Sequence, residues 1–149
     1  MSQYKTHAKF NLFLALPVLV GAIYYLFHPY WTLLALFSFA FAYSTLFMSP
    51  DMDLAHQIKF FSLRGLLTSP FRLYSRIFRH RGLSHSILFG TLTRIGFLSL
   101  LALAGLWIYS QAFPSPNSFL VFLKSNQIPI IYAFAGIFCA DLCHLLLDI

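Results

Sequence analysis

The stretch HRGLSHS, residues 80–86, marks the junction between a polar part of the chain and a long apolar run. It holds two histidines, an arginine and two serines, and the run that follows, residues 87–113, contains a single charged residue, Arg94. About 20 apolar residues suffice to cross the hydrocarbon core of a bilayer. The junction therefore predicts the start of a membrane helix, with Ser84 at its N-cap.

Three more apolar runs extend outward from this junction. Residues 10–30 contain no charged residue and one histidine, residues 31–48 contain neither, and residues 128–149 are interrupted only by two aspartates and a histidine. The chain is 59% hydrophobic and 9% charged with a mean hydropathy of +0.75, whereas soluble domains carry about 25% charged residues. A soluble protein is thereby excluded.

The sequence thus predicts an all-α integral membrane protein, a four-transmembrane-helix bundle forming a single domain over residues 1–149. We expect the first run to be a membrane helix and not a secretory signal, because it is long and a second span follows it at once. The predicted spans are residues 10–30, 31–49, 84–109 and 128–148, with a cytoplasmic segment at 50–83. The connection between the third and fourth spans, from about Ser110 to Gln127, is predicted to be a loop on the other side.

The basic residues predict how the spans are oriented. Two lysines precede the first span and six basic residues lie within residues 50–83, but only Lys124 lies between the third and fourth spans. The positive-inside rule then places both termini and the long segment in the cytoplasm. Positive charge beside membrane spans favours anionic lipid headgroups as partners, and no nucleic acid.

The cytoplasmic segment is predicted to contain an interfacial helix between the second and third spans. Arg72, Arg76 and Arg79 recur at intervals of four and three residues and form one basic stripe, while Phe71, Tyr74, Ile77 and Phe78 cover much of the rest. This pattern is typical of a helix that lies in the headgroup layer.

The acidic residues and most histidines gather at the predicted cytoplasmic ends of the spans. The chain has four acidic residues, all aspartates, and in an up-down-up-down bundle these four ends share one side of the membrane. We therefore predict one metal site there. Its candidate ligands are His7, Asp51, Asp53, His80, His85, Asp141, His144 and Asp148.

The fourth span supports this prediction. At about 100° per residue, Asp141, His144 and Asp148 share one helix face, and Cys139 and Cys143 lie on the other. An aspartate inside a membrane helix costs about 2.5–3.5 kcal/mol and needs a partner. Mixed imidazole and carboxylate ligands suit one or two divalent transition metals, Zn, Mn or Fe. Asn11, one turn after His7, and Ser84 are expected to support the ligands by hydrogen bonds.

Two arginines are the predicted anion-binding residues, Arg81 within the HRGLSHS stretch and Arg94 inside the third span. Arg94 lies about 13 Å along the helix from His85, and Asp141 lies about 10 Å from Asp148. Because these depths are comparable, we expect Arg94 either to pair with an aspartate or to hold an anionic headgroup at the rim of the site.

Other interpretations remain open. Ser49-Pro50 followed by Asp51 and Asp53 also describes an ordinary helix start, a single histidine is often only an interfacial residue, and an Asp–His–Arg network could simply cross-link the bundle. Metal transport ranks last, because the far halves of the spans lack polar residues.

The motifs also resemble a known family. His7…Asn11, SPDMDL at residues 49–54, HRGLSHS at 80–86 and DLCHLLLD at 141–148 resemble, over nearly the whole chain, a bacterial family of metal-binding membrane proteins of unknown function. That family is similar to membrane-bound metal-dependent hydrolases. The resemblance implies a location in the bacterial inner membrane, and it implies that the aspartates and histidines of these motifs are metal and active-site positions.

Two functions follow from the sequence. The first is a metal-dependent hydrolase that acts on a phosphate ester or a lipid-like substrate at the cytoplasmic face. The alternative is a non-catalytic membrane protein in which a structural metal or a polar network joins the helix ends.

Overall fold

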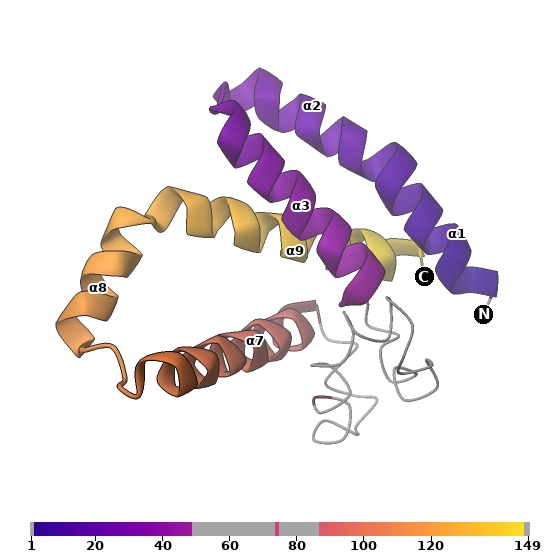
Figure 1. The fold of residues 1–149 in the computed structure, drawn as a ribbon. Coiled ribbons are helices and arrows are strands. Elements are labelled where there is room, and N and C mark those ends of the chain that lie inside the picture. The colour runs from indigo at the N-terminus through magenta and orange to yellow at the C-terminus, as the bar shows by residue number, and fades with distance from the viewer. Residues whose placement is uncertain (1, 49–73, 75–86, 148–149) are drawn as a thin grey trace.

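The computed structural model describes residues 2–48, 74 and 87–147, and within these ranges every regular element is a helix (Figure 1). The all-helical class that the sequence predicts is confirmed for this part of the chain. The elements are α1 (Ser2–Phe10), the π-helical turn η1 (Asn11–Ala15), α2 (Leu16–Phe27), α3 (Trp31–Phe47), α7 (Ile87–Ser110), α8 (Pro116–Ser125) and α9 (Gln127–Leu147).

The first three elements form one long helix with a wide turn in its middle. The N–H of Leu16 donates to the carbonyl oxygen of Asn11, five residues back, as in a π-helix. Pro17 has no N–H and cannot continue the regular α-helical ladder toward Phe13, so the wide turn occurs directly before it. Asn11, the first residue of this turn, is completely buried.

A tight turn joins α2 to α3, at the boundary between the first two predicted spans. His28 ends α2 in the left-handed conformation, with φ of 45°. The rings of Tyr24 and Trp31 stack across the turn with centroids 5.6 Å apart. The two helices therefore run antiparallel from this end (Figure 1).

α9 packs against α3 through small residues. A Cβ atom on Gly136 would lie 2.6 Å from the carbonyl oxygen of Phe37 and 3.1 Å from Ala40 Cβ. Ala140, one turn further along α9, is 1% exposed and packs with Phe37 and Phe41. Small residues four apart allow two helices to approach closely, and here they make the α3–α9 pair the centre of the molecule. Cys139 and Cys143 are free thiols at the edge of this cluster.

α7 packs against the ends of α3 and α9 with its first half, in a cluster that includes Phe97 and Leu101. It lies close to α9 there and then diverges from it, and α8 bridges the separated ends (Figure 1). The sequence predicts a loop over residues 110–127, but the middle of this stretch forms the helix α8, so the prediction is wrong there. Pro116 at the first helical position and the Ser115 hydroxyl, which accepts from the N–H of Ser118 at 3.1 Å, start this helix.

Within residues 2–48 and 87–147, three helical segments are long and apolar enough to cross a membrane, Thr6–Phe27, Thr91–Ser110 and Gln127–Leu147. The fourth predicted span, Trp31–Phe47, has 17 residues, about 25 Å at 1.5 Å per residue. This is shorter than a hydrocarbon core of about 30 Å, so a four-span bundle stays a prediction. Large apolar side chains are widely exposed on the outer surfaces, including Phe13 at 80% and Ile108 at 66%.

Tyr74 is the one described residue of the predicted interfacial helix. Its ring is 6% exposed and packs edge-on against Phe97, with ring centroids 5.5 Å apart, in a cluster that includes Met48. Its hydroxyl lies 2.8 Å from that of Thr93. The rest of the predicted helix lies outside the described residues.

Candidate functional site: a buried polar cluster at one end of the helices

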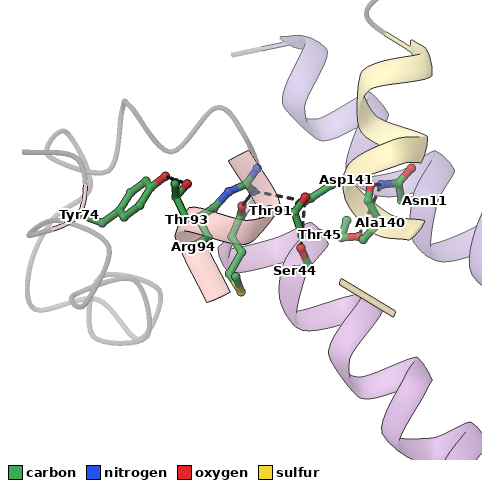
Figure 2. A network of polar contacts seen from close by, with 10 residues as sticks. Asn11, Ser44, Thr45, Tyr74, Thr91, Thr93, Arg94, Ala140 and Asp141 are labelled. Carbon is green, nitrogen blue, oxygen red and sulfur yellow. Dashed lines mark hydrogen bonds and ion pairs between the residues drawn. The ribbon is translucent and has the colours of Figure 1, made fainter. Parts of the chain in front are cut away.

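Polar side chains are buried at the end of the molecule where α1, α3, α7 and α9 meet (Figure 2). This end contains the first residues of α1 and α7 and the last residues of α3 and α9, the ends that the sequence places on one side of a membrane. We call this set the buried polar cluster. It consists of His7, Asn11, Ser44, Thr45, Thr91, Arg94, Asp141 and His144, each at most 8% exposed.

Asp141 is the most highly connected member of the cluster. Its Oδ1 accepts from the Ser44 hydroxyl at 3.2 Å and from Arg94 Nη1 at 3.2 Å, and its Oδ2 accepts from the Thr91 hydroxyl at 2.6 Å. A carboxylate has about four lone-pair sites, so three donors from two neighbouring helices occupy most of them. Asp141 thereby links α9 to both α3 and α7.

Arg94 pairs with Asp141, which confirms the expectation that it finds an aspartate at comparable depth. The side chains are 4% and 2% exposed, so the ion pair is almost completely withdrawn from solvent. The same Nη1 also donates to the carbonyl oxygen of Met48, the residue that ends α3. The arginine therefore joins the beginning of α7 to the ends of α3 and α9.

Asn11 attaches the N-terminal helix to this centre. Its Nδ2 donates to the carbonyl oxygen of Ala140 at 3.3 Å and to the Thr45 hydroxyl at 3.5 Å. The side chain is 0% exposed, and Oδ1 has no hydrogen-bond partner among the described residues. A buried amide oxygen in this state is an acceptor suited to a water molecule or a cation.

His7 and His144 face each other one turn beyond Asn11 and Asp141. Their ring centroids lie 4.9 Å apart with the planes at 79°, and the residues are 8% and 4% exposed. Both belong to the predicted metal site. The structure thus brings together two imidazoles that are 137 positions apart in the sequence, on the face of α9 that also carries Asp141.

The remaining predicted site residues lie outside the described part of the chain. These are Asp51, Asp53, His80, Arg81, Ser84, His85 and Asp148. Among the described residues, no group of three or more His, Cys, Asp or Glu side chains is arranged to hold a metal ion. The metal set as a whole therefore stays a prediction.

The described part of the cluster fits one side of a metal site. Two imidazoles this close can both reach one ion, and imidazole nitrogen is a common ligand of Zn, Fe and related metals. Asn11 adds a buried amide oxygen, and Asp141 lies three residues before His144. Further ligands would have to come from the predicted residues that are not described.

Sequence reasoning missed three hydroxyl residues of the cluster. Ser44, Thr45 and Thr91 each lie in an apolar run, where a hydroxyl can bond to its own helix and carries no signal by itself. One signal was available for Ser44. It lies two turns before Asp51, on a helix whose cytoplasmic end is predicted to carry acids.

Comparison with known proteins gives one match and two negative results. No curated protein and no solved structure matches this chain. Residues 3–149 match the model of the family described as "Uncharacterized metal-binding protein (DUF2227)". The match covers nearly every residue and agrees with the metal-binding character that the sequence motifs suggest, and the chain therefore belongs to this family.

Proposed function

We propose that the chain is a membrane-embedded metal-binding protein whose site includes His7 and His144. The observation that carries this proposal is the contact between these two buried imidazoles, 4.9 Å apart, in a chain whose family is described as metal-binding. Neutral imidazole nitrogens are common ligands of divalent transition metals, and two imidazoles at this distance can both bind one ion. The other predicted ligands are Asp51, Asp53, His80, His85, Asp141 and Asp148.

The proposed activity is hydrolysis of a phosphate ester or a lipid-like substrate at the cytoplasmic face. A divalent metal bound by these residues would polarise a phosphoryl oxygen and activate a water molecule. A histidine of the cluster would accept the proton of that water or donate a proton to the leaving group. Arg81 and the other basic residues that precede α7 in the sequence suit an anionic substrate.

Purified chain tests this activity directly. Phosphate release from phosphatidic acid should stop after chelation, should return when Zn, Mn or Fe is added back and should be lost in His144→Ala. His28→Asn is the matched control, because it changes an exposed histidine at the opposite end of the molecule and asparagine tolerates its left-handed backbone. Equal phosphate release from His144→Ala and the control would contradict the assignment.

The membrane arrangement is tested separately. If the chain spans a bacterial inner membrane with both termini in the cytoplasm, reporters fused after residues 60 and 115 should lie on opposite sides. The reporter after residue 60 should lie in the cytoplasm. Equal signals from the two fusions would overturn the orientation and the common side of the helix ends.

One observation favours a second, non-catalytic function. Asp141 already binds two hydroxyls and the guanidinium of Arg94, which is the behaviour of a cross-link between helices. In this alternative the polar cluster joins the helix ends and a metal, where bound, only stabilises them. A chain that binds metal tightly and gains stability from it, yet releases no phosphate from any phosphorylated lipid offered, would support the alternative.

A further inference from the structure

An apolar groove lies between α7 and α9, beside the buried polar cluster. It encloses about 530 Å³ and is lined on α7 by Leu92 and Ile95 and on α9 by residues between Ile130 and Phe138. These α9 residues span about 12 Å along the helix. Figure 1 shows the two helices closest near the beginning of α7 and diverging from there.

The groove opens sideways. Leu92 is 63%, Ile131 62% and Phe134 42% exposed, so the lining faces the same surroundings as the other apolar outer surfaces. A volume of this size is within the range of ligand sites. An occupant would enter between the helices, from the side, and would have to be apolar along most of its length.

The wall has one polar residue, Thr91, and it lies at the end next to the cluster. Its hydroxyl donates to Asp141 Oδ2 at 2.6 Å, and Arg94 on the following turn binds the other oxygen of this carboxylate. The groove surface is therefore apolar along its whole length, and the buried Arg94–Asp141 pair lies behind the wall at the Thr91 end. An amphiphile in the groove with its head toward Thr91 would have its polar part next to the buried polar cluster.

We propose that the groove binds an acyl chain of a membrane lipid, with the headgroup at the Thr91 end, and that such a lipid is the substrate class of the site; this rests on the proposed function. A second copy of the chain fits less well. Where this protein packs two helices closely it uses small residues, Gly136, Ala40 and Ala140. The groove presents mainly leucine, isoleucine and phenylalanine instead.

The experiment uses the full chain purified in detergent and a phosphatidylglycerol whose acyl chain carries a photoactivatable diazirine. After illumination, peptide mass spectrometry should locate the label on α9 around Ile131 and Phe134. Leu92→Trp should lower this labelling about tenfold, a loss of about 1.4 kcal/mol in binding, because the indole fills the groove. Ile131→Trp should act in the same way from the opposite wall.

Leu100→Trp is the matched control. Leu100 lies on the same helix with a similar exposure, 67% against 63% for Leu92, but it does not line the groove. Its labelling should remain like that of the wild type. The proposal is overturned if Leu92→Trp leaves the labelling unchanged, or if label spreads equally over exposed residues of α2 such as Val18. It is also overturned if the wild type is a dimer that Leu92→Trp dissociates.

Elemental analysis of the same samples separates this inference from the proposed function. Metal-bound protein without labelling of the groove would overturn the lipid site alone. Metal-free protein with specific labelling of the groove would overturn the metal function and leave the lipid site standing.

Discussion

Asp141 and His144 lie three residues apart on the same face of α9 and are almost equally buried, yet their surroundings differ. Asp141 is surrounded by donors from the chain itself, two hydroxyls and the guanidinium of Arg94. His144 contacts another imidazole, that of His7. Asp141 thus has the guanidinium as its direct partner, whereas His144 faces a second imidazole and lies within electrostatic reach of the Asp141 carboxylate.

The difference separates two kinds of buried polar group. A carboxylate that is neutralised by a guanidinium and by hydroxyls contributes cohesion, because removing either charge leaves the other one buried. Two imidazoles offer each other no opposite charge, but together they offer nitrogen ligands to a cation. We therefore assign the joining of helices mainly to the Asp141 side of the cluster and metal binding to the His144 side.

The largest expected effect comes from breaking the ion pair. Arg94→Leu leaves the buried Asp141 carboxylate without its counter-charge, and we expect a loss of about 3–5 kcal/mol in the free energy of unfolding. Unfolding of the purified chain in detergent measures it. Lys124→Leu, which removes an exposed lysine at the far end, should change stability by at most about 0.5 kcal/mol.

The double variant Arg94→Leu with Asp141→Leu sharpens this test. Removing both charges leaves no unpaired ion, so the double variant should be more stable than Arg94→Leu alone. Additive losses would mean that the two side chains act independently, and the cohesive role of the pair would be wrong.

The next effect concerns the contact that brings α9 close to α3. Gly136→Ala places a Cβ atom 2.6 Å from the backbone oxygen of Phe37, so α9 has to move, at a cost of about 1–3 kcal/mol. The Asp141 bond to Ser44 should weaken with it. Gly105→Ala on α7 is the control, since nothing lies within 4 Å of its Cβ, and helix propensity favours alanine there by about 1 kcal/mol. A Gly136→Ala variant as stable as this control would show that the helices are further apart than described.

The smallest effect comes from a single hydroxyl. Thr91→Val removes the donor to Asp141 Oδ2 while Arg94 and Ser44 remain, and we expect a loss of about 1 kcal/mol. Thermal unfolding compares it with Ser110→Ala, whose hydroxyl bonds to its own helix in an exposed position and should matter little. A loss as large as that of Arg94→Leu would show that Thr91, and not the guanidinium, holds the carboxylate.

The sequence predicts much of this arrangement because charges are scarce in it. With one charged residue inside the third apolar run and few acids elsewhere, counting the residues from each helix end predicted that Arg94 pairs with an aspartate or holds an anionic headgroup, and it pairs with Asp141. The same comparison of helix ends predicted that His7 and His144 lie at the same end of the molecule, where they are in contact. Apolar runs with no charge also identify the helices themselves.

Other features depend on contacts that no local pattern reveals. Gly136 and Ala140 are four residues apart, but only the position of Phe37 shows that a Cβ atom would collide there. The wide turn before Pro17, in which Asn11 bonds to Ala140 of α9, is likewise a tertiary feature. For α8 the signal was present, since Ser115-Pro116 is a Ser-Pro pair of the kind that often starts a helix.

The most direct test of the account is the metal content of the chain, measured by elemental analysis after growth with Zn, Mn and Fe. Four purified proteins are compared: wild type, His7→Ala, His144→Ala and His28→Asn. We predict at least one tightly bound transition metal ion per chain in the wild type and in His28→Asn. Removing an imidazole ligand should greatly weaken binding in the other two, with metal lost on dialysis. Metal-free wild type, or an equal metal content in His144→Ala and His28→Asn, would contradict the assignment of the His7–His144 pair.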